Sequence, residues 1–181
     1  MCFLCDQGIK RRKMNKVFIL LGGNSGDKKK NLSIAAKHIA VRVGKIEKRS
    51  SLYETEAWGM NEQPSFLNQV LRVLTQKNAL QVLGLILDIE QKMGRKRIEK
   101  WEARIIDIDI LFFNKEIIHE EDLIIPHPFI QDRRFTLVPL NEIAPDLIHP
   151  LYHKNINELL RVCSDQMGVK KWNDGKMVDS K

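Results

Sequence analysis

The spacing of hydrophobic residues changes repeatedly along this chain, and the changes predict its order of strands and helices. Residues 17–21 are all apolar, which is typical of a short buried strand. From residue 28 onward, apolar residues recur every three to four positions, which predicts a helix that ends near Gly44. Taken in order, the pattern predicts a strand at 17–21, a helix at about 28–43, strands at 46–55 and 66–75, a helix between Asn78 and Gly94, and a strand at 104–113.

This order of elements, β-α-β-β-α-β, is that of the split β-α-β or ferredoxin-like arrangement. It predicts an α+β fold in which a mostly antiparallel sheet carries two helices packed on one face. The loops and the other face are then left for a functional site. The rest of the chain predicts only short elements: extended pieces within 117–123, one helical turn at 133–140 and a helix at 156–163.

Length and composition fit one globular domain. The chain has 181 residues, enough for a sizeable core. We expect residues 14–172 to form a single domain, residues 1–13 to be a disordered or adventitious extension, and residues 173–181 to be a frayed tail. No apolar run approaches the ~18 residues of a membrane span. Apolar Phe3–Leu4 precedes the basic run at 10–13, the reverse of a secretory signal, so we expect a cytoplasmic protein.

Two carboxylates interrupt the apolar strand predicted at 104–113. The period of a strand places Asp107 and Asp109 on one face, about 6.6 Å apart at ~3.3 Å per residue, and the neighbouring isoleucines on the other. Carboxylates in so apolar a strand are costly unless something compensates their charge. An acid pair on a rigid strand suits Mg²⁺, which takes oxygen ligands and keeps substrate phosphates in its shell. The competing interpretation is an ordinary solvated strand face.

A basic segment immediately precedes this strand. Residues 95–104 hold five basic and two acidic side chains. Metal-binding acids beside phosphate-binding bases favour phosphoryl transfer from a nucleotide, although such a segment on its own is more often a solvated turn. The net charge of the chain is +7, and residues 1–13 contribute +3 of it through four bases and one acid, leaving +4. That remainder is modest for a nucleic-acid-binding protein and natural for an enzyme that holds phosphates.

Two further segments contain candidate phosphate-binding residues. The glycine-rich turn at 22–27 lacks the lysine and hydroxyl of a P-loop, and a tight strand-to-helix connection explains it equally well. His127 is held between two prolines, with Arg133 six residues further on. These two could bind a nucleotide phosphate, although a lone histidine is more often a structural hydrogen-bonding residue.

A third segment contains candidate residues for a flat ligand. Trp58 and Phe66 are aromatic residues near a predicted loop, and Asn68 is an amide on a predicted strand. An aromatic pair with a nearby amide can stack a heterocycle and bind its edge. Packing in the core is the alternative for both rings.

Several short motifs follow one another from about Lys16 to Trp172. They are Gly22-Gly23-Asn24, Ser51-Leu52-Tyr53-Glu54-Thr55, Phe66-Leu67-Asn68, Glu90-Gln91-Lys92-Met93-Gly94-Arg95, Arg104-Ile105-Ile106-Asp107-Ile108-Asp109-Ile110-Leu111, Pro126-His127-Pro128, Arg133-Arg134-Phe135, Val138-Pro139-Leu140 and Ile143-Ala144-Pro145. Each motif alone is weak, but all of them in this order and spacing are highly specific. Together they make the chain resemble the 6-hydroxymethyl-7,8-dihydropterin pyrophosphokinases of folate biosynthesis.

This resemblance implies a reaction and its ligands. The family transfers the β,γ-diphosphate of ATP to the hydroxymethyl group of the reduced pterin and releases AMP. By position, Asp107 and Asp109 would hold two Mg²⁺ ions that bridge the ATP phosphates. Residues 14–172 would then be the catalytic domain. The expected partners are the two small substrates alone, bound by a monomer with no nucleic acid and no membrane.

The resemblance also assigns residues to each task. Those implied to be catalytic are Arg97, Arg104, Asp107 and Asp109. Those implied to bind ATP are Glu90, Arg95, Arg97, Trp101, Arg104, His127 and Arg133. Those implied to bind the pterin are Thr55, Trp58, Phe66, Asn68 and Phe135. The segment from Gly94 to Trp101 is one residue shorter than expected for the family, so Arg95, Lys96 and Arg97 are alternatives for its basic roles.

Two other functions share parts of this pattern. A ferredoxin-like RNA-binding module would carry exposed aromatic residues on its central strands and a basic sheet face. Here one strand carries two aspartates, which would repel a phosphate backbone. A phosphoryl transferase for another small alcohol would share the acid pair and differ only around Trp58, Phe66 and Asn68.

Overall fold

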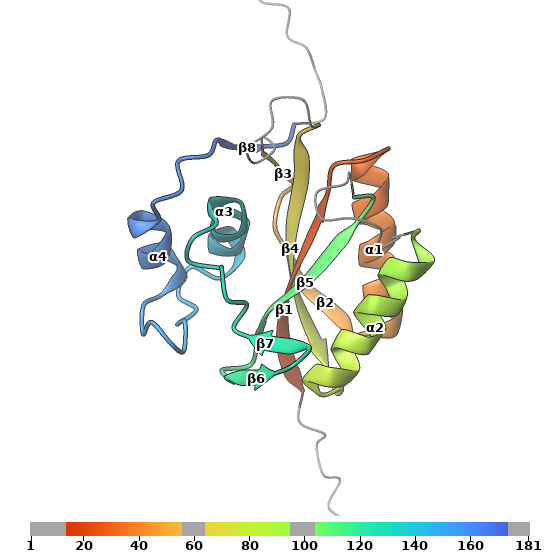
Figure 1. Ribbon diagram of the computed structural model, residues 1–181, viewed down its shortest axis with the longest axis horizontal. Coiled ribbons are helices and arrows are strands. Elements are labelled where there is room, and N and C mark those ends of the chain that lie inside the picture. Colours follow the sequence, from red (N-terminus) through yellow and green to blue (C-terminus); the bar gives the residue numbers. More distant parts are fainter. Residues whose placement is uncertain (1–13, 56–63, 95–103, 174–181) are drawn as a thin grey trace, which may run out of the picture.

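The centre of the molecule is an antiparallel sheet that stands between two pairs of helices (Figure 1). The computed structural model describes residues 14–55, 64–94 and 104–173. Strands follow the order β5-β1-β4-β3-β8, and β2 also pairs with β4. Their bounds are β1 (Asn15–Gly23), β2 (Lys45–Arg49), β3 (Tyr53–Thr55), β4 (Phe66–Thr75), β5 (Asp107–Phe113) and β8 (Val169–Lys171).

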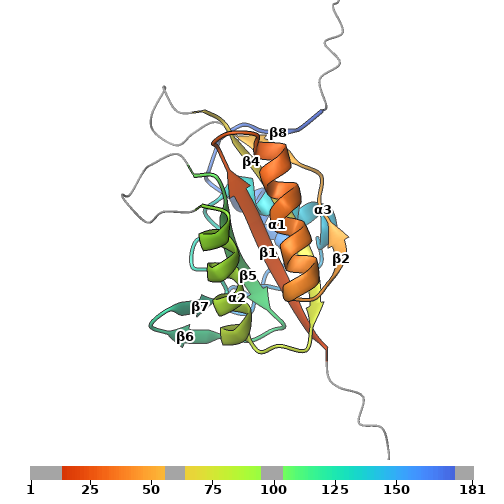
Figure 2. The same ribbon diagram turned by 90° about the vertical axis from the view of Figure 1, so that its right-hand side faces the viewer.

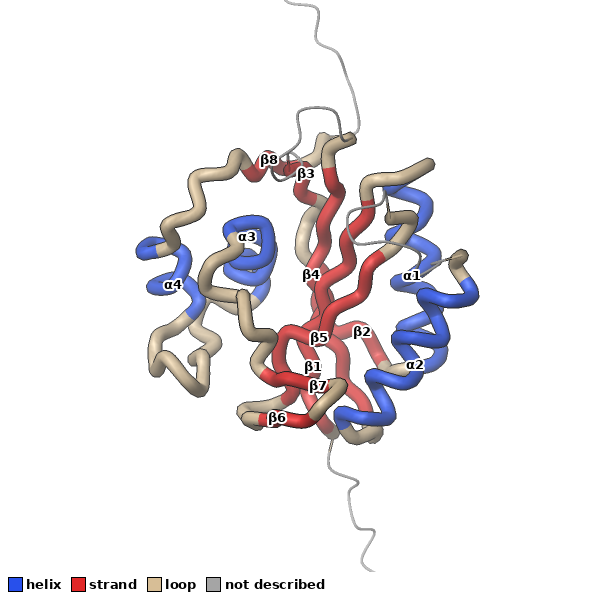
Figure 3. The backbone as a smooth tube through the Cα atoms, viewed as in Figure 1, coloured by secondary structure: helices blue, strands red, loops and turns tan. Residues whose placement is uncertain are grey.

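Helices cover both faces of this sheet (Figure 3). Two helices lie side by side on one face, in front of the sheet in Figure 2, and two shorter helices lie on the other. The first pair is α1 (Lys28–Arg42) and α2 (Ala79–Lys92), and the second pair is α3 (Arg134–Ile143) and α4 (Ile156–Val162). A separate two-stranded sheet consists of β6 (Ile118–Glu120) and β7 (Leu123–Ile125). Within the described ranges, no helix is long and apolar enough to span a bilayer.

Local sequence signals explain where α2 begins and ends. The Asn78 side chain accepts a hydrogen bond from Gln81 N, and the Gln81 side chain accepts one from Asn78 N, which forms a capping box. Gly94 follows the helix with φ +90°, a conformation that glycine adopts without steric cost. Both predicted boundaries of this helix are confirmed.

Each face of the sheet has its own hydrophobic core. The core under α1 and α2 contains Val17, Ile19 and Leu21 of β1 together with the buried residues of both helices. The core under α3 and α4 contains Phe18 and Leu20, the alternate residues of the same strand. β1 is therefore buried on both faces, which explains its continuous apolar sequence.

An extra residue in β5 changes which face its side chains occupy. Ile19 pairs with Ile110 and Phe18 pairs with Phe112, so Leu111 has no opposite residue on β1. Leu111 and Phe112 both pack in the core under α3 and α4. Because of the bulge, β5 carries polar residues on one face at its start, whereas at its end the side chains on both faces are buried in the two cores.

The predicted α+β fold and the order of the main elements are confirmed. The strand predicted at 46–55 is divided in two, because Ser51 N donates to the Glu142 carboxylate at 2.7 Å rather than to a neighbouring strand. α3 is longer than the single turn predicted, and with α4 it covers part of the face that the pattern left open. The edge strand β8 was not predicted, because three residues carry too little pattern.

Candidate active site

A row of paired residues crosses the sheet at the end where β5 begins. Asp107 of β5 pairs with Gly22 of β1, and Gly22 pairs with Asn68 of β4. Asn68 in turn pairs with Tyr53 of β3. Directly opposed residues of antiparallel strands project to the same face. This is the α3 face, because Leu20, two residues before Gly22, packs in the core under α3.

Gly22 leaves the middle of this row without a side chain. A Cβ at this position would lie 3.1 Å from Asn68 Oδ1. Since adjacent strands are about 4.8 Å apart, the backbones of Asp107 and Asn68 are about 10 Å apart across the glycine. The site therefore has an acidic end and an amide end joined by a bare strip of backbone.

The acidic end contains the predicted carboxylate pair. Asp107 and Asp109 are half-buried on one face of β5, while Ile108 and Ile110 are buried on the other. Arg104 Nη1 donates to Asp107 Oδ2 at 2.6 Å. Two carboxylates fit Mg²⁺, which commonly binds one or two of them and completes its shell with phosphates and water. No cluster of three or more potential protein ligands occurs in the described part of the chain, so substrate and water would have to supply the other ligands.

The glycine-rich turn holds the segment that leads into β5. Arg104 N donates to Asn24 Oδ1 at 2.7 Å, and Asn24 N donates to Arg104 O at 3.0 Å. A Cβ on Gly23 would lie 2.7 Å from the Ile105 carbonyl oxygen, so this approach requires glycine. Of the two interpretations of the turn, these contacts favour the structural connection, and through it the turn positions Arg104.

The amide end gathers three of the residues predicted to bind the pterin. Asn68 is 2% exposed, and its Nδ2 donates to Thr55 Oγ1 at 3.0 Å. Phe66 pairs with Thr55 and lies two residues from Asn68, so its ring belongs to the same face. A buried amide beside an aromatic ring can bind the polar edge of a flat heterocycle.

The start of α3 adds a cation and two rings. The Arg133 guanidinium lies 4.9 Å from the centre of the Phe129 ring and 5.7 Å from that of the Phe135 ring. Cation–π contacts of this kind hold a guanidinium in a fixed position. Phe135, in the first turn of α3, is half-buried against the core under α3 and α4.

His127 is a neutral residue near these charges. Burial, and after it the Arg133 charge, lowers the pKa of His127 to about 4, while the Asp107 charge acts in the opposite direction. The backbone N–H of His127 donates to Leu111 O at 3.0 Å, and its ring Nδ1 accepts from the backbone N–H of Phe129 at 3.3 Å. The neutral ring therefore carries its proton on Nε2, where it can serve as a hydrogen-bond donor.

Glu90 lies apart from the other predicted residues, on α2. It is 2% exposed, and its Oε1 accepts from Ile108 N at 2.8 Å. Ile108 stands between the two aspartates, so Glu90 fixes the edge of the strand that carries them. Contact between Glu90 and ATP stays a prediction.

A carboxylate that the sequence did not reveal ties α3 to the amide end. Glu142 accepts from Ser51 N at 2.7 Å and from Ser51 Oγ at 2.8 Å, and it lies 3.6 Å from Lys171 Nζ of β8. Burial raises the pKa of Tyr53, and the charge and hydrogen bond of Glu142 raise it further. Glu142 lies on α3 and Tyr53 on β3, so only the packing of the helix against the sheet brings them together, and no local sequence signal could have identified them.

The structure therefore sorts the predicted residues into three groups, apart from Glu90 on α2 and Phe135 at the start of α3. Those at the acidic end are Arg104, Asp107 and Asp109, with His127 within electrostatic reach of Asp107 and Arg133 within reach of His127. Those at the amide end are Thr55, Phe66 and Asn68. Those outside the described residues are Trp58, Arg95, Arg97 and Trp101.

Comparison with known families explains why these residues occur together. The sequence model of 7,8-dihydro-6-hydroxymethylpterin-pyrophosphokinase (HPPK) matches residues 18–145. The chain belongs to the HPPK family. The match runs from β1 through α3, so it includes both ends of the site and the glycine strip between them. The resemblance found in the sequence motifs is confirmed.

Individual relatives of the HPPK family extend over most of the chain. The 2-amino-4-hydroxy-6-hydroxymethyldihydropteridine pyrophosphokinase of Aquifex aeolicus is 41% identical over 145 residues, which cover 80% of this chain and 90% of the relative. The enzyme of the same name from Bacillus subtilis is 38% identical over 169 residues, which cover 91% and 95%. This chain therefore corresponds to these proteins over nearly their full length.

Solved HPPK structures share the fold. A crystal structure of HPPK-DHPS in complex with substrates matches with a TM-score of 0.68 at 20% identity, over 82% of this chain and 43% of that one. Plasmodium falciparum wild-type HPPK-DHPS with pteroate matches with a TM-score of 0.68 at 22% identity, over 82% and 42%. The chain thus spans less than half the length of these solved proteins.

Proposed function

We propose that this chain transfers the β,γ-diphosphate of ATP to the hydroxymethyl group of 6-hydroxymethyl-7,8-dihydropterin, giving AMP and the pterin diphosphate, a step of folate biosynthesis. Its membership of the HPPK family and the names of its relatives support this activity. The structural observation that carries the proposal is the row in which the acid pair and the buried amide share one face across Gly22.

The pterin side of the reaction is proposed at the amide end. Asn68 would bind the polar edge of the ring, and Phe66 with Phe135 would contact its flat faces. Thr55 orients Asn68 through its hydroxyl. A ring held there could extend its hydroxymethyl group along the Gly22 strip toward the acidic end.

The nucleotide side is proposed at the acidic end. Arg104 and Arg133 are permanent cations that would neutralise phosphate charge, and neutral His127 would donate a hydrogen bond. The basic segment at 95–103 would add Arg95, Arg97 and Trp101. Because phosphoryl groups need little covalent help, holding them in line is the main contribution expected of the protein.

We infer that the reaction depends on Mg²⁺, with two ions held by Asp107 and Asp109. A carboxylate pair with an adjacent phosphate-binding region is the donor set that this cation prefers. When bound, the ions would neutralise charge on the transferred group. Glu90 accepts a hydrogen bond from Ile108 N, and Arg104 donates one to Asp107. These contacts would hold the start of β5 with both carboxylates on one face.

A turnover assay with ATP, Mg²⁺ and 6-hydroxymethyl-7,8-dihydropterin tests this function. We expect AMP to form only when pterin and metal are both present. Formation of ADP would mean that a single phosphoryl group is transferred and would refute the proposed reaction. Absence of turnover by folded protein, together with binding to RNA, would favour the non-catalytic alternative.

A further inference from the structure

Lys28, the first residue of α1, joins the ends of the two strands that carry the amide end of the site. Its Nζ donates to Ser65 O at 2.9 Å and to Ser65 Oγ at 2.8 Å, and it lies 3.4 Å from Glu54 Oε1. An ammonium group has three N–H donors. All three are used between a residue of β3 and the residue that precedes β4.

The two acceptors are also joined to each other. Ser65 Oγ donates to Glu54 Oε1 at 2.5 Å, so the hydroxyl accepts from the lysine and donates to the carboxylate. The Lys28 side chain is 19% exposed and that of Glu54 is 37% exposed. Three charge-assisted contacts to one ammonium group define its position, even though Glu54 is accessible to solvent.

This cluster lies at the amide end, on the opposite face of the sheet from the side chains of Thr55 and Phe66. Glu54 pairs with Leu67, which belongs to the core under α1 and α2, whereas the next residue, Thr55, pairs with Phe66 on the opposite face. Ser65 immediately precedes Phe66. A shift of Glu54 or Ser65 would therefore move Thr55 or Phe66 by a comparable amount.

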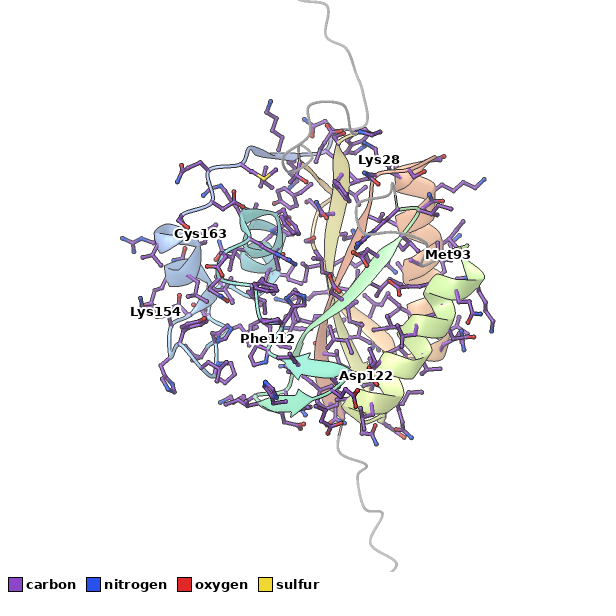
Figure 4. All side chains as sticks on the ribbon, viewed as in Figure 1. Lys28, Met93, Phe112, Asp122, Lys154 and Cys163 are labelled. Carbon is purple, nitrogen blue, oxygen red and sulfur yellow. The ribbon has the colours of Figure 1, made fainter. Side chains whose placement is uncertain are left out.

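The chain beyond β8 is attached to the same point. The Lys28 ammonium lies 5.8 Å from the centre of the Trp172 ring, and Trp172 N donates to Leu52 O at 2.8 Å. Figure 4 labels Lys28 at the end of the sheet where β4 and β3 meet α1. Three other parts of the chain, at Glu54, Ser65 and Trp172, thus contact this one lysine of α1.

We infer that Lys28 is a positioning residue for the pterin: it sets the separation of Thr55 and Phe66 without touching the substrate. The inference rests on the proposed function. Because a partly exposed ion pair contributes little to global stability, Lys28 affects the affinity for the pterin more than the folding of the chain. The acidic end lies on β5, at the far side of β1, and the described contacts of the Lys28 ammonium are with Glu54, Ser65 and Trp172, so we expect loss of this side chain to affect ATP affinity much less than pterin affinity.

The test compares Lys28→Met with the wild-type enzyme. We expect KM for the pterin, and the pterin Kd measured by titration with a non-hydrolysable ATP analogue present, to rise roughly tenfold, the effect of losing one charge-assisted contact. KM for ATP and the melting temperature should stay close to the wild-type values. Lys28→Arg, which keeps the charge and the donors, should recover part of the pterin affinity.

Lys30→Met is the matched control, since it removes the same charge from the same helix at an exposed position. Unchanged pterin affinity in Lys28→Met, or equal losses for ATP and pterin, would overturn the inference. If Lys28→Met does not fold, Glu54→Gln is used with the same expected result. A wild-type enzyme that fails to turn over the pterin refutes the proposed function itself, whereas normal wild-type turnover with an unaffected Lys28 variant refutes only the positioning role.

Discussion

At the scale of the residue, the chemistry of this protein depends on alternation along β5 and on one glycine opposite it. The period of the strand was sufficient to predict that Asp107 and Asp109 share a face. It could not reveal that Gly22 lies beside Asp107 and Asn68, because the register between strands comes from long-range pairing. The residues on each strand were therefore predictable, and the row that they form was not.

Asp109→Ala tests the acidic end. We expect turnover to fall by at least about a thousandfold, because a proposed metal ligand is lost, while the protein stays folded. The measurement is initial rate at saturating ATP and Mg²⁺, with circular dichroism to check folding. Asp122→Ala, which removes an exposed acid between β6 and β7, is the control and should behave as wild type. Wild-type turnover in Asp109→Ala would move the metal site elsewhere.

Gly22→Ala tests the bare strip between the two ends. The added methyl group would lie 3.1 Å from Asn68 Oδ1, so the amide must shift. We expect KM for the pterin to rise roughly tenfold, as leaving a polar edge poorly paired costs about 1–3 kcal/mol. Gly168→Ala, where a Cβ meets nothing within 4 Å, should leave KM unchanged. An unaffected KM in Gly22→Ala would place the pterin away from Asn68.

At the scale of the element, predictions succeeded where the local signal is strong. α2 has a capping box at its start and a left-handed glycine after its end, and both were recognised from sequence. The division between β2 and β3 was missed, because it depends on Glu142, which lies 91 residues away in sequence from Ser51. α3 was predicted too short for a similar reason, since Pro139 lies inside it and packing against the sheet maintains the helix.

Gly84→Ala should stabilise α2. The residue is exposed within the helix, and a Cβ there would meet nothing within 4 Å. Alanine restricts the unfolded chain and favours the helix, so we expect the free energy of unfolding to rise by about 0.4–1 kcal/mol. Urea denaturation measures the change, and turnover should not alter. A decrease in stability would mean that the helix is distorted at this turn.

At the scale of the whole molecule, two cores share one sheet, and the second was hidden from sequence. Its residues come alternately from β1 and from distant helices, with Leu111 and Phe112 entering through the bulge. His149 completes this core, 1% exposed, between the rings of Phe112 and Tyr152. Its Nδ1 accepts from Leu151 N at 3.3 Å, an arrangement that requires a neutral ring.

The buried histidine makes stability depend on pH. Burial lowers the pKa of His149 to about 4, against 6.5 in the unfolded chain, so below 6.5 the unfolded state takes up a proton that the folded state does not. Stability should therefore be full above pH 6.5 and fall as the pH drops toward 4, by about 1–2 kcal/mol per group at pH 5. His127 acts in the same direction.

Urea denaturation at pH 7 and pH 5 measures this effect in the wild type and in His149→Gln. The variant should lose less stability between the two pH values, because the contribution of His149 is removed while that of His127 remains. Equal losses in both proteins would show that His149 does not control the acid response.

The arrangement of the sheet also determines at which end of the chain a tether or fusion partner is best attached. β1 begins at the end of the sheet opposite the candidate site, where Asn15 pairs with Thr75, whereas β8 pairs with β3 beside the amide end (Figure 1). A tether attached ahead of residue 14 would leave the amide end of the site accessible to solution. A tether attached after residue 173 would lie next to Trp172 and Lys28, close to the amide end. Immobilised binding experiments and fusion partners should therefore use the amino-terminal side.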